Sequence, residues 1–356
     1  MKTLRLAVDP ANLESPAARQ AIAQSAEILR RGGTVAFPTE TVYGLGANAL
    51  DSDAVAKIFA AKERPGWDPI IVHISDPALL ARVATSIPTN AGALMDAFWP
   101  GPLTLLLPKH PGVPEAVTAG RERVGVRMPA HPVALALLRA AGVPVAAPSA
   151  NRFGRTSATT AAHVAQDLDS RIDAILDGGP TTHGVESTVA DVRDEICTIF
   201  RPGVITLEQM RSVLGSEVRE ISADAEQKEP DQGAVAPGLG MRHYAPRARL
   251  VLVDGEVPAL QAVLAATARG LEEAGDTVGL MLPAGFRQGA EHAHTFDWGN
   301  WDDADELARR LFAGLRWLDS QGVTVIVCPV PSAQGIGVAL RDRLRKAARR
   351  LQSPDP

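Results

Sequence analysis

The chain has 356 residues and a formal charge of −5 at pH 7, with 46% hydrophobic but only 4% aromatic residues. This length allows two domains with sizeable cores, and the acidic balance excludes a protein that coats nucleic acid by bulk charge. No run of 18 apolar residues and no long apolar stretch near the start are present, so we expect neither a membrane span nor a secretory signal. Cys197 and Cys328 lie far apart, as expected for two buried, reduced thiols.

The first predicted helix begins at Ser15-Pro16, where a hydroxyl can cap the helix and proline suits its first turn. It ends at Gly32-Gly33 and leads into a short β-branched and aromatic strand, residues 34–37. The chain then runs into Thr39-Glu40-Thr41-Val42-Tyr43, which Gly44-Leu45-Gly46 closes. A polar cluster at the end of a strand, followed by glycines that let backbone approach a ligand, is typical of a small-molecule site. An ordinary turn that carries polar side chains, without any ligand, would show the same pattern.

Helices and strands alternate irregularly over the following 150 residues or so. We expect helices at 51–62, 77–86, 89–98 and 131–141, and strands at 70–74, 103–107, 124–128, 144–147, 173–176, 187–192 and 198–201. Proline-rich corners interrupt this alternation. The pattern predicts a mixed, twisted α/β sheet in a first domain of residues 1–215.

Residues 216–248 are polar, rich in glycine and proline, and lack periodicity, which predicts a long linker. After the linker, strands predicted at 250–253, 278–282 and 323–327 alternate with helices at 258–274, 303–318 and 335–349. Regular alternation of this kind predicts a small parallel α/β domain with Rossmann-like winding over residues 249–356.

Cationic side chains gather at two places in the first domain. If residues 123–127 form a strand, Arg123, Gly125 and Arg127 share one face, and the apolar residues between them share the other. Guanidinium groups bind carboxylates and phosphates, although a solvated sheet edge would show the same pattern. Lys62 and Arg64 follow a helix C-terminus, where phosphate binding and simple helix capping are both open.

Other polar residues carry weaker signals. His73 lies inside an apolar strand, which favours a core histidine over a ligand. Ser149 and Asn151 follow small residues at a strand end and Ser187 precedes a strand, so they can form a phosphate nest or ordinary turns. The sequence contains neither a P-loop nor a nucleophile elbow. Glu291-His292-Ala293-His294 lacks partners at zinc spacing, and we interpret it as a surface loop rather than a metal site.

Eight motifs in order closely resemble those of the YrdC-type threonylcarbamoyl-AMP synthases: PTETVYGLG, AAKERP, IIVHI, WPGPLT, VRMPAHP, APSAN, GVESTV and RPG. The resemblance is dense over residues 20–210, and the linker with the C-terminal domain resembles the long, two-domain form of the family. It implies a YrdC-like sheet with a concave basic pocket. The implied reaction converts L-threonine, bicarbonate and ATP to threonylcarbamoyl-AMP and pyrophosphate, for modification of the adenosine next to the anticodon of tRNAs that read ANN codons.

The resemblance also implies roles for individual residues. Two cations are implied as catalytic, Lys62 and Arg64. The residues implied for L-threonine are Thr41, His73, Arg127, Ala147 through its backbone, and Ser187. The residues implied for ATP are Arg64, Asp68, Arg123, Ser149, Asn151, Ser157, Arg201 and Tyr244. Tyr244, in the linker, would cover the nucleotide as a lid. The chain departs from the family pattern at Trp67-Asp68, where an Asp followed by Asn or His is usual before the proline.

These residue types suit the implied chemistry. Threonine and bicarbonate would form an N-carboxy-threonine, whose carboxylate attacks the α-phosphorus of ATP and expels pyrophosphate, so no protein nucleophile is needed. The transfer needs positioning and positive charge, which Lys, Arg and Mg²⁺ carried on the triphosphate supply. The resemblance further implies a cytoplasmic enzyme with no membrane partner. Its product would pass to tRNA threonylcarbamoyl-transfer proteins, and the enzyme itself would bind tRNA weakly at most.

Two alternatives share much of this pattern. An RNA-binding module without turnover would use a concave basic face lined by Lys57, Lys62, Arg64, Arg121 and Arg123, with salt-dependent affinity. Few aromatic residues are available to stack on bases, and hydroxyls stand among the cations, which favours the enzyme. A carbamoyl-transfer domain of the hydrogenase-maturation type shares the fold, but its usual zinc-finger and acylphosphatase segments are not seen.

Overall fold

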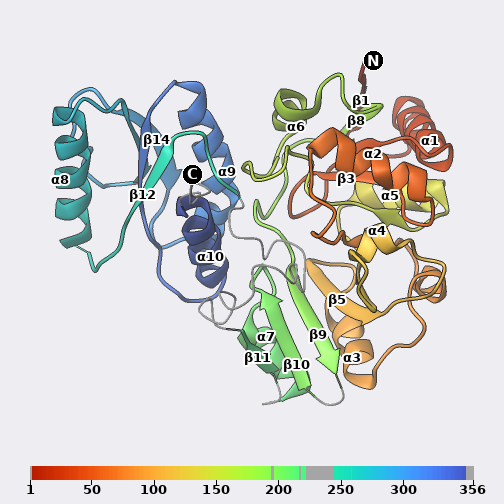
Figure 1. Cartoon of the computed structure of the whole chain (residues 1–356). Coiled ribbons are helices and arrows are strands. Elements are labelled where there is room, and N and C mark those ends of the chain that lie inside the picture. The colour runs from red at the N-terminus through yellow and green to blue at the C-terminus, as the bar shows by residue number, and fades with distance from the viewer. Residues whose placement is uncertain (1, 194–195, 216–217, 222–243, 258, 350–356) are drawn as a thin grey trace, which may run out of the picture. The chain divides into compact units, whose positions relative to one another are not determined.

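The computed structural model describes residues 2–193, 196–215, 218–221, 244–257 and 259–349 (Figure 1). Its contacts divide the chain into two compact units. The first comprises Met1–Phe153 and Ser157–Gly240, and the second comprises Gly154–Thr156 and Met241–Pro356. Most of the predicted linker, 216–248, lies outside the described residues.

The first unit is built on a mixed sheet. Its described strands follow the order β1-β8-β2-β3-β7-β4-β6-β5-β9-β10-β11. Their bounds are β1 Leu4–Ala7, β2 Val35–Phe37, β3 Gly44–Asn48, β4 Val72–His73, β5 Leu103–Pro108, β6 Arg123–Arg127, β7 Val145–Ala146, β8 Ala174–Asp177, β9 Thr188–Arg193, β10 Ile196–Arg201 and β11 Val218–Glu220. Parallel pairs such as β5/β9 alternate with antiparallel pairs such as β5/β6, so the predicted mixed sheet is confirmed.

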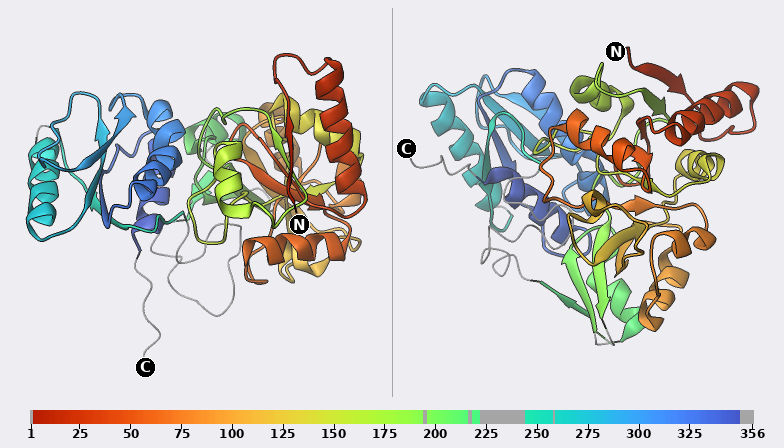
Figure 2. Two further views of the ribbon diagram at one scale, coloured as in Figure 1. Left: turned by 90° about the horizontal axis from the view of Figure 1, so that it is seen from above. Right: turned by 45° about the vertical axis from the view of Figure 1, so that its right-hand side comes forward.

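Helices cover both faces of this sheet. Their bounds are α1 Pro16–Arg30, α2 Ser52–Lys62, the 3-10 helix η1 Pro77–Arg82, α3 Thr89–Phe98, α4 Glu115–Thr118, α5 Pro132–Ala141, α6 Ala161–Leu168 and α7 Leu207–Leu214. Helices α1 and α5 pack together over one face, where Val35, Phe37 and Val145 join their core (Figure 2). Helices α2, α3 and α6 contribute to the core on the other face, with Leu45, Val72 and Val126.

The strand register decides which side chains share the face of α1 and α5. His73 is the cross-strand partner of Val145 on β7 and of Arg127 on β6. Cross-strand partners project from the same face of a sheet, so Arg127 lies on the face that carries Val145. Farther along this sheet, the small apolar cluster of Ile71, Leu106 and Val189 is separate from the α1/α5 core. Thr104, a residue of the candidate site, lies beside this cluster, because an added Cβ on Gly125 would meet Thr104, Ile71 and Leu106 within 3.5 Å.

The predicted start of the first helix is confirmed by its cap. The Oγ of Ser15 accepts a hydrogen bond from the Ala18 N–H at 3.2 Å, and Pro16 occupies the first turn. This cap satisfies one of the N–H groups that have no partner within the helix. The helix starts next to β1 and buries Ala26 and Leu29 against the sheet.

The sequence did not predict the strand that contains Gly44 and Gly46, the two glycines expected to let backbone approach a ligand. Both lie in strand β3, antiparallel to β2, with Phe37 opposite Gly44 and Val35 opposite Gly46. A Cβ on Gly46 would lie 2.8 Å from Phe37 Cε1 and 2.8 Å from Val145 Cγ1. The glycines are therefore needed because side chains of the α1/α5 core pack directly on the strand.

The second unit contains an all-parallel sheet, whose described strands follow the order β12-β15-β13-β14. Its elements are β12 Arg249–Val253, α8 Ala259–Glu273, β13 Val278–Pro283, β14 His294–Gly299, α9 Ala304–Ser320, β15 Val325–Pro329 and α10 Gly337–Ala348. Helix α8 lies on the opposite side of this sheet from α9 and α10 (Figure 1). The predicted parallel α/β domain is confirmed.

The surface loop expected at Glu291-His292-Ala293-His294 ends earlier than predicted, because His294 begins strand β14 beside β13. This strand was missed because only its end is strongly apolar. Trp298 is fully buried there, and its Nε1 donates to the Leu307 carbonyl at 2.9 Å. Across the residues that the structure describes, no helix combines the length and apolar character that crossing a membrane requires.

Candidate active site

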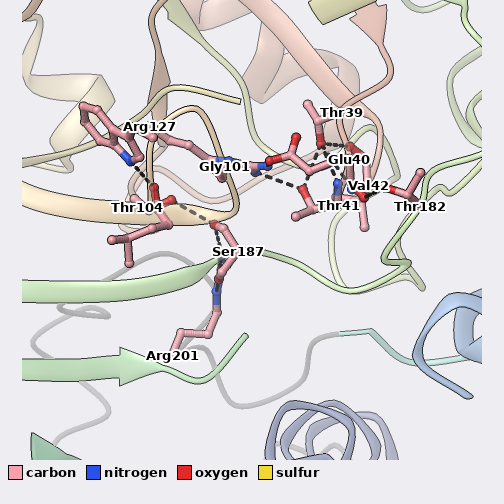
Figure 3. Close-up of polar contacts among 12 residues, drawn as sticks. Thr39, Glu40, Thr41, Val42, Gly101, Thr104, Arg127, Thr182, Ser187 and Arg201 are labelled. Carbon is pink, nitrogen blue, oxygen red and sulfur yellow. Dashed lines mark hydrogen bonds and ion pairs between the residues drawn. The ribbon is translucent and has the colours of Figure 1, made fainter. Parts of the chain in front are cut away.

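Arg127, the last residue of β6, is the centre of the candidate site (Figure 3). The residue is 3% exposed, and each of its side-chain nitrogens contacts a different group. Nε donates to the Gly101 carbonyl at 3.1 Å, Nη1 donates to Thr41 Oγ1 at 2.9 Å, and Nη2 lies 2.5 Å from Glu40 Oε1. The guanidinium is thus held in one orientation by two segments far away in the sequence.

The segment 39–43 connects β2 to β3 and is itself held by polar contacts. Thr39 Oγ1 lies 2.8 Å from Thr41 Oγ1 and donates to the Val42 carbonyl at 2.6 Å. The N–H groups of His183 and Gly184 donate to the carbonyls of residues 40 and 41 at 2.8 and 3.1 Å. The loop before β9 is therefore fixed against the residues that contact Arg127.

The same segment also binds the loop after β7. The Tyr43 carbonyl accepts from the Ala150 N–H at 2.7 Å, and the Tyr43 N–H donates to the Ala158 carbonyl at 2.8 Å. Ala150 and Ala158 follow Ser149 and Ser157 in the chain, so both serines lie next to residues that bind Tyr43. The polar segment recognised in the sequence therefore binds two loops, the one after β7 and the one before β9.

Ser187, immediately before β9, is buried and connects two further residues. Its Oγ lies 2.8 Å from Thr104 Oγ1, and Arg201 Nη2 donates to that Oγ at 3.1 Å (Figure 3). Arg201 also donates to the Ser187 carbonyl from Nε at 3.1 Å and from Nη2 at 3.0 Å. A second buried guanidinium therefore stands behind the serine hydroxyl.

His73 is buried beside Arg127, as the strand register requires. Burial, followed by the nearby Arg127 charge, lowers the pKa of His73 to about 3. Burial also lowers the pKa of His131, whose Nδ1 accepts from the Val133 N–H at 3.2 Å and caps α5. Both imidazoles are therefore neutral at pH 7, and His73 presents an uncharged ring to the site.

Ala147, just past the end of β7, uses its own N–H within the sheet. That N–H donates to the Ile71 carbonyl at 2.9 Å. The methyl group of Ala147 packs close to Gly44, where an added Cβ would lie 3.3 Å away. Ala147 is therefore a small, buried residue that connects the sheet next to β4 with the loop that carries Ser149.

The side chains of Lys62 and Arg64 both donate hydrogen bonds to backbone carbonyl groups. Lys62, at the end of α2, is 1% exposed, and its Nζ donates to the Ser149 carbonyl at 2.6 Å and to the Asn151 carbonyl. Arg64 donates to the Asp68 and Pro69 carbonyls at 3.1 and 2.7 Å. Lys62 does not cap its own helix in these contacts, because its ammonium lies in the loop after β7.

Buried carboxylates accompany several of the cations. Arg64 Nη2 lies 2.9 Å from Asp68 Oδ2, and Asp68 is fully buried despite the exposed Trp67 before it. Arg123 Nη2 lies 2.5 Å from Asp191 Oδ1, and Ser157 Oγ donates to Glu186 Oε1 at 2.5 Å. Arg64 and Arg123 are therefore each paired with a buried carboxylate rather than placed on an open basic face.

Tyr244 belongs to the second unit in this structure. Its ring stacks on Phe312 of α9 with centroids 5.7 Å apart and an interplanar angle of 27°. The guanidinium carbon of Arg343 lies 5.0 Å above the same ring, and Tyr244 is 4% exposed. Of the predicted linker before Tyr244, residues 216–217 and 222–243 lie outside the described residues, whereas Val218–Glu220 form β11, so the linker begins later than predicted.

The structure joins three of the five predicted threonine residues through contact or strand register: Thr41, His73 and Arg127. Ser187 instead contacts Thr104 and Arg201. The structure also joins Lys62 with Ser149 and Asn151, and Arg64 with Asp68. Sequence reasoning assigned no role to Glu40, Thr104, Glu186 or Asp191. Glu40 stood in the polar segment from the start, but nothing local in the sequence indicates which arginine a carboxylate will meet.

Two family models match the chain. One, described as "Telomere recombination", matches residues 27–203, and one described as "Threonylcarbamoyl-AMP synthase, C-terminal domain" matches residues 205–349. The chain is 44% identical over 350 residues to the threonylcarbamoyl-AMP synthase of Bacillus subtilis, covering 98% of both chains. It is 44% identical over 324 residues to that of Pyrococcus abyssi, covering 91% of this chain and 93% of the relative.

A solved structure shares the whole fold. The chain superposes on P. abyssi Sua5 complexed with L-threonine with a TM-score of 0.88 and 40% identity, covering 98% of each chain. The similarity therefore extends over both units, not over the first alone.

Proposed function

The chain belongs to the threonylcarbamoyl-AMP synthase family and is an enzyme of that activity, and we propose how its own residues use L-threonine, bicarbonate and ATP. The observation that carries the proposal is Arg127, a buried guanidinium fixed between Thr41 and Glu40 beside His73. Such a group suits the carboxylate of an amino acid, and a relative with the same fold has been solved with L-threonine.

The L-threonine carboxylate would bind the free edge of Arg127. A guanidinium has five N–H donors, and contacts with Gly101, Thr41 and Glu40 involve three of them. Two donors are left for a carboxylate, as bidentate binding requires. The hydroxyls of Thr41 and Ser187 and the neutral ring of His73 would face the rest of the substrate.

The ATP phosphates would lie against the second set of cations. Lys62 and Arg64 approach the loop that carries Ser149 and Asn151, and Arg201 reaches Ser187 from behind. Ser157 and Arg123 complete the residues that we assign to the nucleotide. Because Arg201 contacts the serine of the threonine pocket, it would bring the innermost phosphate next to the amino acid.

With both substrates in place, the N-carboxy-threonine carboxylate attacks the α-phosphorus and pyrophosphate leaves. The residues would position the reactants and balance developing negative charge, without a covalent intermediate on the protein. Mg²⁺ enters as part of the ATP substrate. Among the described residues, no group of three or more His, Cys, Asp or Glu side chains is placed to hold a metal.

We further propose that the product passes in the cytoplasm to proteins that transfer threonylcarbamoyl to tRNA. The alternative of an RNA-binding module is disfavoured by the charge pairs. Arg64 and Arg123, two of the cations needed for a basic face, are paired with Asp68 and Asp191. Paired, partly buried cations contribute little to phosphate-backbone binding.

Pyrophosphate release tests the assigned substrates. The enzyme is incubated with ATP, Mg²⁺ and bicarbonate, with and without L-threonine. We expect release that depends on threonine, together with threonylcarbamoyl-AMP detected by mass spectrometry. Turnover that ignores threonine would reject the substrate.

Substituting Arg127 tests the carboxylate role. In Arg127→Ala we expect the KM for L-threonine to rise about 100-fold or more, because a charge-assisted bidentate contact is worth roughly 3 kcal/mol. The KM for ATP should change little. Arg5→Ala is the control, because Arg5 pairs with Asp169 at the exposed end of β1. A similar increase in both KM values would remove Arg127 from the carboxylate role.

The lid role of Tyr244 stays a prediction. In the structure the Tyr244 ring stacks on Phe312 and lies under Arg343. We expect Tyr244→Ala to lower turnover while both units stay folded, as measured by pyrophosphate release and thermal unfolding. Unchanged turnover would dismiss the lid.

A further inference from the structure

In the function proposed above Glu40 only holds Arg127 in place, although it lies beside this central residue of the site. Its side chain is 7% exposed, and its Oε1 lies 2.5 Å from Arg127 Nη2 (Figure 3). Burial by itself raises the pKa of Glu40, but the Arg127 charge and hydrogen bonds from Arg127 and the backbone outweigh it, so the pKa lies below its usual value. Glu40 is therefore a carboxylate at pH 7.

The Arg127–Glu40 pair contributes no net charge to the threonine pocket. The two imidazoles whose charges interact with Glu40, those of His73 and His131, both have lowered pKa values and carry no charge at pH 7. The positive charge of Arg127 and the negative charge of Glu40 therefore cancel. Arg201, on the far side of Ser187, faces the phosphates in the proposed function.

A neutral, buried pocket favours a ligand that is itself neutral overall. An unmatched charge is costly to bury, whereas alternating charges stabilise one another in a low-dielectric site. L-threonine carries one carboxylate and one ammonium at pH 7. With its carboxylate on Arg127, L-threonine would complete a set of four alternating charges. These are the Arg127 guanidinium, the substrate carboxylate, the substrate ammonium and the Glu40 carboxylate.

We propose that Glu40 is a specificity-determining residue, which balances Arg127 so that the pocket accepts an amino acid zwitterion in preference to an acid without an ammonium group. The inference rests on the proposed function, in which Arg127 binds the substrate carboxylate. It assigns Glu40 an effect on ligand choice, which a purely structural partner of Arg127 would not have.

The test compares two ligands by calorimetry on the full chain, without ATP or bicarbonate. L-threonine is compared with the 2,3-dihydroxybutanoate of the same stereochemistry, in which a hydroxyl replaces the ammonium. The wild-type enzyme should prefer L-threonine. In Glu40→Gln the pocket becomes positive, so L-threonine affinity should fall about 10-fold or more while the hydroxy acid binds as well or better. Equal losses for both ligands, or no change in either, would overturn the proposal.

Two further variants complete the test. Glu40→Asp keeps the negative charge, so the enzyme should still prefer L-threonine even where the affinities for both ligands fall. This variant also provides the test if Glu40→Gln does not fold. A lost preference in Glu40→Asp contradicts the proposal. Glu27→Gln is the matched control, because Glu27 pairs with Arg30 at 2.7 Å on the surface of α1, and both affinities should stay unchanged.

Arg127→Gln separates this inference from the proposed function. Loss of binding for both ligands supports Arg127 as the carboxylate site. If Arg127→Gln binds both ligands normally, the threonine pocket itself is wrong. If Arg127→Gln loses binding while Glu40→Gln keeps the wild-type preference, only the inference about Glu40 fails.

Discussion

At the scale of single residues, the site consists of buried polar groups whose contacts come from distant segments. Arg127 and Thr41 are 86 positions apart, and Thr104 and Ser187 are 83 positions apart. Each buried polar group needs a partner, since an unsatisfied one costs roughly 1–3 kcal/mol. The loops are therefore fixed by the polar contacts as much as by the apolar cores.

His73 gives a prediction about stability and pH. Its pKa is about 3 in the folded chain, against 6.5 as the usual value. Between these values the unfolded chain binds a proton that the folded chain does not, so stability is full above pH 6.5 and falls as the pH drops toward 3. Between the two pKa values, His73 lowers the free energy of unfolding by up to about 1.4 kcal/mol for each unit by which the pH falls.

Urea unfolding at pH 7, 6 and 5 measures this effect. In His73→Gln, the free energy of unfolding of the first unit should depend less steeply on pH over this range. The comparison is between slopes, so a constant loss of stability from the substitution does not disturb it. Identical slopes in the two proteins would contradict a buried, neutral His73.

At the scale of elements, the hairpin of β2 and β3 carries the polar segment. Glycines within β3 leave space for Phe37 and Val145, and the segment 39–43 begins where Phe37 ends the preceding strand. The position of Thr41 and Glu40 therefore depends on how closely β3 packs under these side chains.

Gly46→Ala tests this dependence. The added Cβ would lie 2.8 Å from two core side chains, so we expect a loss of about 1–3 kcal/mol in the free energy of unfolding. We also expect a raised KM for L-threonine, because β3 directly follows the polar segment. Gly92→Ala in α3 is the control, since an added Cβ there meets nothing within 4 Å. That change should be neutral or stabilising by up to about 1 kcal/mol. Equal effects of the two substitutions would argue against the packing account.

At the scale of the whole molecule, each unit has its own core and its own buried cysteine. Cys197 lies in β10 of the first unit and Cys328 in β15 of the second. Burial, with a smaller effect from Asp191, raises the pKa of Cys197 to about 12, and burial also raises the pKa of Cys328. The two thiols are free and buried, as predicted from the sequence.

These thiols can report the unfolding of each unit. In the native protein at pH 8, neither should react with a thiol reagent within minutes, because the thiolate is disfavoured and inaccessible. In urea, Cys328→Ala reports the first unit and Cys197→Ala the second. The first unit is larger and exposes more surface on unfolding, so its labelling should depend more steeply on urea. Rapid native labelling, or a steeper dependence for the second unit, would contradict this view.

Much of the secondary structure was accessible from local pattern. The predicted cap at Ser15, the strand around Leu103–Leu107 and the alternation after residue 249 all correspond to observed elements. The missed strands, such as β1 and β11, are short and lie at sheet edges, where burial leaves little periodicity. Strand β3 was also missed, because glycine in the sequence does not distinguish a loop from a strand packed under a large side chain.

The sequence by itself determined the order of the elements, the two-part α/β architecture and the polar motifs that indicate the family, because propensity, caps and motif spacing are local. Only the tertiary structure decided that Glu40 meets Arg127, that Asp191 meets Arg123 and that Lys62 reaches the loop after β7. The physical reason is that these pairs depend on strand order and register in the sheet. Local preferences do not specify which distant strands become neighbours, and therefore do not specify which charges balance one another.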